Sequence, residues 1–238
     1  MAANLTRYSY WQFRDFIRER GLALIITSTL LGFTVVAPMR AMLGSNIDEV
    51  NAKRILMMAL PQLVYISAFI ALNGLISTDR KLGYYRFLFS KPVSIPAYYA
   101  QYFLVSLVGF LAVFAFLLGV FAFVVRPVSP FGALAWCGLV YLSFGGIAFF
   151  ISSLFRYDWP ILAGVYLGSA LVNGLWADRG GFRMVIRDML PPVHKLSAAM
   201  NDIMNLGTVD TNSVLWLLGY SALCFVAGLF VLWRRPIG

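Results

Sequence analysis

The sequence predicts an all-α membrane protein with six transmembrane helices, organised as a single domain over residues 1–238. Hydrophobic residues make up 61% of the chain and charged residues 12%, whereas soluble domains are about 45–50% apolar and about 25% charged. Six apolar segments each approach the roughly 20 residues that cross a bilayer. None of the ten acidic residues falls in the middle of these segments. These observations exclude a soluble enzyme and a disordered protein.

The first element in chain order is an N-terminal interfacial helix within residues 1–21. The segment 4–20 carries too many charges to cross a membrane. On a helical wheel its basic residues, such as Arg14, lie on one side, and residues such as Phe16 gather near the other. Such a helix lies in the membrane interface, and we expect it to lead into the first span at Gly21.

Six membrane spans follow the interfacial helix. Each is a long apolar run, and the third is long enough to tilt or to project beyond the hydrocarbon. The expected spans are Leu22–Met39, Ile55–Ser77, Tyr98–Val125, Gly132–Leu154, Trp159–Trp176 and Ser213–Trp233.

Two connections between the spans are longer than a turn requires. Residues 78–97, between spans two and three, mix aromatic and charged residues in the pattern of an amphipathic helix, which Pro92 would stop. Residues 177–212, between spans five and six, have apolar residues at helical spacing on either side of the proline pair that begins at Pro191. We expect two short helices there, on or in the outer leaflet.

The distribution of basic residues predicts the orientation in the membrane. Of the 19 Lys and Arg residues, 11 lie on the side that holds both termini and residues 78–97, and 8 lie on the other side. By the positive-inside rule, the first side faces the cytoplasm and residues 177–212 lie outside. The net charge of +9 therefore reflects orientation in a bilayer, and we expect no nucleic-acid partner.

The chain has no motif for covalent chemistry or for binding ATP phosphates. The P-loop pattern is absent, and the one histidine, His194, lies in the outer connection, where a surface role is expected. Cys137 and Cys224 both lie in apolar runs, which supports neither a disulfide framework nor a zinc site. We expect no catalytic residue, no metal site and no cofactor bound by this chain.

Two stripes of polar and aromatic side chains lie on the second and fifth spans. Spacings of three and four residues put the members of each stripe on one helix face. Because buried amides in lipid need partners or water, both stripes should face protein or a cavity. They either line a pathway or hold helices together by hydrogen bonds. The members are Gln62, Tyr65, Phe69 and Asn73 on the second span, and Tyr166, Ser169 and Asn173 on the fifth.

Two pairs of glycines on the fourth and fifth spans predict close helix packing within one subunit. Gly145 and Gly146 are neighbours on the fourth span, and Gly164 and Gly168 form a G-x-x-x-G pattern on the fifth. Small residues of this kind let helix backbones approach one another in a membrane.

Residues 79–94 of the cytoplasmic connection read DRKLGYYRFLFSKPVS. This run has acidic and basic residues, then a glycine, a short apolar helix and an ending from Leu88 to Ser94 with the pattern Ser-x-Pro-Val-Ser. It resembles the loop between spans two and three of type-2 ATP-binding cassette (ABC-2) permeases. The order of elements is also similar to that family, with an N-terminal helix, six spans and both termini inside.

The resemblance implies that this loop holds a coupling helix, which docks into a groove of a separate ATPase subunit. Its aromatic and apolar residues would anchor the helix, and charged residues would lie at the rim. The alternative is an interfacial helix whose basic residues reach lipid phosphates. The expected docking residues are Asp79, Arg80, Lys81, Tyr84, Tyr85, Arg86, Phe87 and Leu88.

The resemblance further implies an ATP-driven exporter in the cytoplasmic membrane of a bacterium or archaeon. Two copies of a soluble ATPase subunit would bind ATP and Mg²⁺, and a second permease subunit, identical or different, would complete the transporter. In this family the translocation path is a cleft between the permeases, lined by spans two and five. The resemblance therefore favours a pathway role for the two stripes. The outer connection 177–212 could hold an extracytoplasmic partner.

Two other functions compete with the exporter. A non-transporting membrane anchor or assembly subunit would recruit partners without any substrate effect on their ATPase activity. An ion-coupled carrier is disfavoured, because such carriers usually need an ionisable group inside the bilayer and the expected spans hold no acidic residue at their centres.

Overall fold

The computed structural model describes residues 5–43, 47–82, 94–155, 158–176, 190–191, 193–203 and 210–234. The structure is all-helical and contains no strand among these residues. The helices are α1 (Leu5–Phe16), a π-helical turn η1 (Ile17–Gly21), α2 (Leu22–Leu43), α3 (Glu49–Leu72), α4 (Ser77–Leu82), α6 (Ile95–Val124), α7 (Pro130–Leu154), α8 (Asp158–Leu175), α10 (Val193–Asn201) and α11 (Thr211–Arg234).

Five helices of the described chain are long and apolar enough to cross a membrane, which makes this a multi-pass membrane protein. They are Tyr8–Met42, Glu49–Asp79, Ile95–Val124, Pro130–Leu154 and Thr211–Arg234. They match five of the six spans that the sequence predicts.

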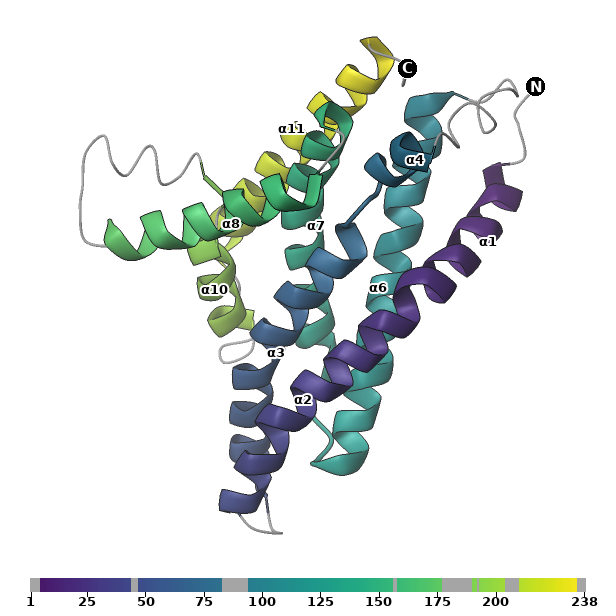
Figure 1. Ribbon diagram of the computed structural model, residues 1–238. Coiled ribbons are helices and arrows are strands. Elements are labelled where there is room, and N and C mark those ends of the chain that lie inside the picture. The colour runs from purple at the N-terminus through teal and green to yellow at the C-terminus, as the bar shows by residue number, and fades with distance from the viewer. Residues whose placement is uncertain are drawn as a thin grey trace.

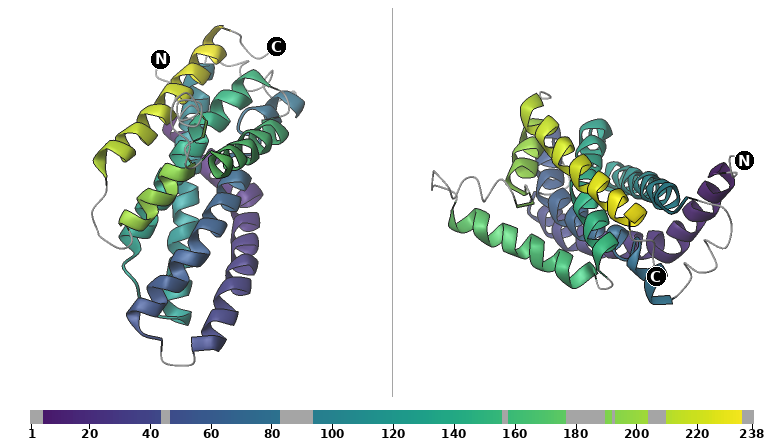
Figure 2. Two further views of the ribbon diagram at one scale, coloured as in Figure 1. Left: turned by 90° about the vertical axis from the view of Figure 1, so that its left-hand side faces the viewer. Right: turned by 90° about the horizontal axis from the view of Figure 1, so that it is seen from above.

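The expected fifth span corresponds to α8, which is apolar but shorter, with its apolar part at Trp159–Leu175. Figures 1 and 2 show α8 running across the direction of α7 and extending outward from the bundle. A sixth span therefore stays a prediction.

The N-terminal helix differs from a separate interfacial segment. It continues without a break through η1 into α2 and packs along α6 (Figure 1). The Phe16 ring is fully buried, and a Cβ atom added to Gly109 of α6 would lie only 2.4 Å from it. The Gln12 side chain donates a hydrogen bond to the Tyr98 carbonyl of α6 at 3.5 Å. A helical wheel cannot show this partner, because α6 lies more than 80 residues away in the chain.

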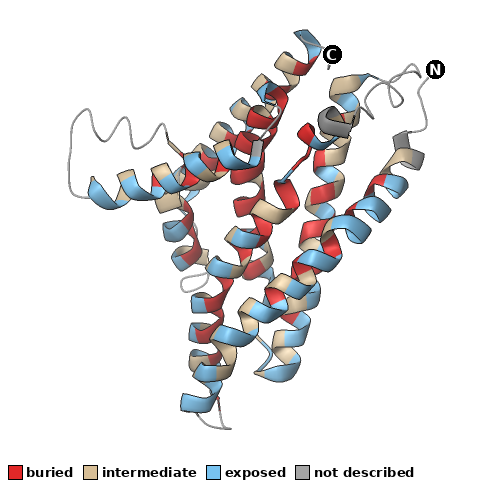
Figure 3. Ribbon diagram, viewed as in Figure 1, coloured by how far each residue is buried: buried red, intermediate tan, exposed pale blue. Residues whose placement is uncertain are grey.

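The core is built around α7, which carries the largest share of buried residues (Figure 3). Trp136, Tyr141 and Phe149 are fully buried there. The glycine prediction is confirmed for Gly145 and Gly146. A Cβ atom at Gly145 would lie 2.5 Å from the Phe103 ring of α6, and one at Gly146 would lie 2.4 Å from the Ser221 carbonyl oxygen of α11.

For the glycine pair on α8, the described residues make no such contact. A Cβ atom added at Gly164 or Gly168 would have no other atom within 4 Å among the described residues. The pair follows the G-x-x-x-G spacing, but no described helix faces it. The spacing alone therefore does not produce a contact.

The short connections are described in part. The start of α1, α4 and the end of α11 all lie at one end of the bundle, and the end of α2 and the start of α3 lie at the other (Figure 1). Of the two helices expected within 177–212, α10 is present, while the segment 177–189 lies outside the described residues. The Trp136 indole Nε1 fixes α10 by donating to the Leu196 carbonyl at 2.9 Å.

Candidate functional site

The predicted docking loop is described only at its start. The backbone of α4 includes Asp79, Arg80 and Lys81, and of these only the Asp79 side chain is described. The remaining predicted docking residues lie outside the described residues and are Tyr84, Tyr85, Arg86, Phe87 and Leu88.

The start of this loop is attached to the bundle by contacts that we call the α3–α4 joint. The joint consists of the turn 73–76 and four side chains from four elements, which are Arg20 of η1, Asp79 of α4, Tyr99 of α6 and Ser152 of α7. In the turn, Gly74 has a φ of +72°, which glycine adopts without the steric cost that a Cβ atom would add.

Ser152 holds the beginning of α4. Its Oγ accepts hydrogen bonds from the backbone N–H groups of Ile76 at 3.1 Å and Ser77 at 3.2 Å. All three residues are buried. N–H groups at a helix start have no partner within the helix, and leaving one unpaired in the interior costs about 1–3 kcal/mol. Ser152 therefore pairs two donors that α4 itself cannot pair.

Arg20 holds the end of α3. Its Nη1 donates to the Ala71 carbonyl at 2.7 Å, in the last turn of the helix, where carbonyls lack an intrahelical partner. The positive charge also suits the negative end of the helix dipole. The guanidinium carbon lies 5.6 Å from the centre of the Tyr102 ring, within range of a cation–π interaction with α6.

Asp79 connects α4 to α6. The Tyr99 hydroxyl donates to Asp79 Oδ2 at 3.0 Å, and the carboxylate also interacts electrostatically with Arg20. Tyr99 is fully buried. The first turn of the predicted docking loop is thus tied to η1, α6 and α7 at once.

Sequence reasoning missed Arg20, Tyr99 and Ser152. Two signals were present, since Arg20 lies two residues before the first expected span and Ser152 lies near the end of the fourth. Neither signal indicates which residue is the hydrogen-bond partner. The bonds join residues 51 and 76 positions apart, such as Arg20 with Ala71 and Ser152 with Ile76.

Three of the seven predicted pathway residues meet in one aromatic cluster. Tyr166 of α8 stacks on Phe144 of α7 with ring centres 3.9 Å apart, and Phe69 of α3 meets Tyr166 edge-on at 5.1 Å. Tyr65 stacks on Phe144 at 5.4 Å and meets Trp136 edge-on at 5.9 Å. The cluster fills the space between α3, α7 and α8.

The remaining members of the stripes lie outside the cluster. Ser169 Oγ donates to the Pro191 carbonyl at 2.6 Å, and Asn173 Nδ2 donates to Ser169 Oγ at 3.3 Å. Gln62 and Asn73 are exposed. In this conformation the α8 stripe connects α8 to the segment before α10, which is the hydrogen-bonding role that the sequence left open. A role in lining a pathway stays a prediction.

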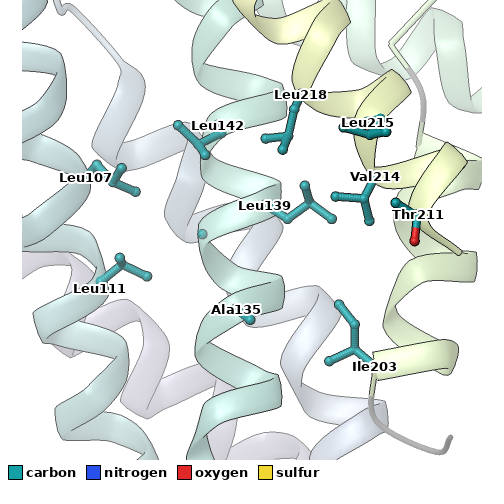
Figure 4. Close-up of a pocket in the computed structure, with 11 residues that line it drawn as sticks. Leu107, Leu111, Ala135, Leu139, Leu142, Ile203, Thr211, Val214, Leu215 and Leu218 are labelled. Atoms are coloured by element: carbon teal, nitrogen blue, oxygen red, sulfur yellow. The ribbon is translucent and has the colours of Figure 1, made fainter. Parts of the chain in front are cut away.

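Two cavities lie elsewhere in the described chain. One of about 500 Å³ is bordered by apolar side chains of α6, α7 and α11, with Leu107, Leu139 and Leu218 among them (Figure 4). The other, of about 350 Å³, lies between α2, α3 and α6. Neither is lined by a residue of the two stripes.

The described residues contain no group of three His, Cys, Asp or Glu side chains that could hold a metal ion. The thiols of Cys137 and Cys224 are both free, the first buried and the second half-buried. We assign no metal or cofactor site to them.

Comparison of the sequence with protein-family models gives no match, and comparison with curated proteins gives none either. The class of protein rests on the fold itself. Five long apolar helices, among them the largely buried α7, define an all-helical, multi-pass membrane protein.

Proposed function

We propose that this chain is the membrane-spanning subunit of an ATP-driven exporter of the ABC-2 permease kind. A separate ATPase, which binds ATP and Mg²⁺, docks on the loop that begins at Asp79. The resemblance of residues 79–94 to that family's loop supports the docking role. The position of α4 at the same end of the bundle as the start of α1 and the end of α11 agrees with a cytoplasmic loop between cytoplasmic termini (Figure 1).

The α3–α4 joint is the observation that carries the proposal. A docking element transmits force only if it is fixed to the helices that must move. Ser152 and Tyr99 fix the start of this loop to α7 and α6, and Arg20 of η1 holds the end of α3 beside it. Closure of an ATPase dimer therefore displaces three membrane helices together with the loop.

Transport then requires α8 to separate from α3. In this proposal the contact between Phe69 and Tyr166 keeps the path closed, and a second permease subunit provides the opposite wall. Substrate enters when these rings part. The exporter resides in the cytoplasmic membrane of a bacterium or archaeon, with α4 facing the cytoplasm.

A non-transporting membrane anchor is the second candidate, and the aromatic cluster favours it. Tyr166 is buried and in ring contact with Phe69 and Phe144. Such packing is what a purely structural subunit needs. The two candidates differ in one measurable respect, because only an exporter couples ATP hydrolysis to substrate movement.

The test measures association and turnover separately. The chain is purified with its co-purifying ATPase, reconstituted in lipid vesicles and assayed for bound ATPase and for ATP hydrolysis. We expect the double substitution Tyr84→Ala and Phe87→Ala to abolish both. The matched control is Tyr10→Ala with Trp11→Ala, an exposed aromatic pair at the same end of the bundle, which should change neither.

Ser152→Ala tests the joint itself. It removes the acceptor for Ile76 and Ser77 and leaves the docking loop intact, so we expect normal ATPase binding with weakened lipid-dependent stimulation of turnover. Binding and turnover unchanged in the Tyr84/Phe87 variant would refute the docking role. If the Tyr84/Phe87 variant loses ATPase binding but ATP hydrolysis by the parent complex does not depend on substrate, the membrane anchor is favoured.

A further inference from the structure

A groove between α2, α3 and α6 lies at the end of the bundle opposite α4. It has a volume of about 350 Å³ and is lined almost entirely by apolar side chains, among them Leu60, Leu63 and Phe121. Phe33 and Val120 also line it and are themselves exposed. The groove therefore opens on the outer surface of the bundle, where a membrane protein meets lipid.

The groove has the length of one membrane leaflet. Its α2 wall runs from Ser28 to Arg40, and at about 1.5 Å per residue this distance is about 18 Å. Half of the hydrocarbon core of a bilayer is about 15 Å thick. The groove thus reaches from one membrane surface to about the middle of the bilayer.

The groove is long and apolar, with aliphatic and aromatic side chains of three helices along it. An extended hydrocarbon chain suits this shape and chemistry. At the inner end, the hydroxyl groups of Ser28 and Ser67 are hydrogen-bonded to each other at 2.9 Å. Because these two hydroxyl groups satisfy one another, an apolar chain can lie beside them.

The positively charged side chain of Arg40 lies at the surface end of the groove. Arg40 lines it, is exposed, and forms no hydrogen bond or ion pair with any described residue. The adjoining segments add three more cations, at the start of α3 and just after α6. Two acidic residues lie at the start of α3, so the positive charges outnumber the negative ones at this end. The added cations are Lys53, Arg54 and Arg126, and the acidic residues are Asp48 and Glu49.

We propose that this groove binds one acyl chain of an anionic phospholipid, whose phosphate is held by Arg40. The guanidinium group suits a phosphate because its N–H groups can donate two parallel hydrogen bonds. An apolar groove of one-leaflet length, ending in a cation that has no partner among the described residues, matches both halves of such a lipid. The proposal does not depend on the transport function.

The test compares two lipids with the same acyl chains. The full-length chain in detergent is mixed with phosphatidylglycerol or phosphatidylcholine, and the bound lipid is counted by native mass spectrometry. We expect the anionic lipid to bind about fivefold more tightly, as one arginine at a membrane surface provides. Arg40→Gln should remove this preference, whereas Arg18→Gln, an exposed cation of η1 that lies outside the groove, should keep it.

Gly32→Leu tests the acyl-chain half of the site. Gly32 lines the groove, and a Cβ atom there would meet only Leu63 Cδ1 at 3.8 Å, an ordinary contact. The new side chain should fill the slot and reduce binding of both lipids, with the thermal unfolding temperature in detergent unchanged. Equal binding of the two lipids to the parent protein, or a preference that survives Arg40→Gln, would overturn the proposal. The proposal would also be overturned if the parent protein is a dimer, and if Gly32→Leu dissociates this dimer without changing lipid binding. The groove would then bind a second copy of the chain.

Discussion

The helices α7 and α8 have similar compositions and different surroundings. Both are apolar and both contain a pair of glycines. Most of α7 is covered by other helices, and its glycines Gly145 and Gly146 lie against Phe103 and the Ser221 backbone. On α8 the glycines have no described atom within 4 Å of an added Cβ, and Leu167 is exposed. The comparison teaches that small residues permit a close approach between helices but do not produce one.

The largest effect is expected from Gly146→Val. Its Cβ atom would lie 2.4 Å from the carbonyl oxygen and 2.9 Å from the Cα atom of Ser221. Backbone cannot move aside as a flexible side chain can, so α11 must shift. Overpacking of this kind costs about 1–3 kcal/mol, and we expect the upper end. Thermal unfolding in detergent, followed by circular dichroism, should show a decrease of several degrees; an unchanged midpoint would mean that α7 and α11 are not in close contact.

The next largest effect should come from Phe144→Ala, which removes the main contact between α7 and α8. The Phe144 ring stacks on Tyr166 and Tyr65 and meets Phe69 edge-on. We expect a loss of about 2 kcal/mol, below the 3–5 kcal/mol seen for such truncations in soluble cores, because lipid is as apolar as the interior. Phe116→Ala, an exposed phenylalanine of α6, is the matched control and should leave the unfolding midpoint in place.

A smaller effect is expected from Ser169→Ala on α8. It removes the hydrogen bond to the Pro191 carbonyl. Such bonds between membrane helices contribute about 0.6 kcal/mol on average and up to about 1.7 kcal/mol. Hydrogen exchange should become faster in α10, which begins two residues after Pro191, and remain the same in α11. Unchanged exchange in α10 would show that this bond does not restrain α10.

The smallest effect, and one of opposite sign, is expected from Gly168→Ala. Nothing lies within 4 Å of the added Cβ atom among the described residues. Alanine in a helix is favoured over glycine by about 0.5–1 kcal/mol. The isolated subunit should therefore unfold at the same or a slightly higher temperature. Destabilisation of the isolated subunit would show that the open face of α8 is in fact covered.

Much of the fold follows from hydrophobic runs of membrane length. The expected spans Gly132–Leu154 and Ser213–Trp233 lie within two residues of α7 and α11 at each end. The second span ends earlier than expected, at Leu72, because Asn73 and Gly74 form a turn in which Gly74 takes a positive φ. An apolar run does not show such a turn, since the residues after it are apolar as well.

Of the candidate site, only the features formed by residues close together in the sequence were predictable. A helix at the start of the docking loop is present as α4. The contacts that hold α4 were not predictable, because Ser152 and Tyr99 are unremarkable members of long apolar helices. In the same way, Tyr65, Phe69 and Tyr166 were expected to share a surface and do meet, but the ring of Phe144 that joins them was not among the predicted residues.

By itself the sequence determined that this is a helical membrane protein and where most of its helices run, because lipid imposes the same length and apolar composition on every span. Only the tertiary structure decided which helix is central, which glycines are covered and which side chains hold α4. Inside a bilayer every face of a span is apolar, so hydrophobicity does not distinguish a protein-facing side from a lipid-facing one. That choice depends on shape and on single hydrogen bonds between residues far apart in the chain.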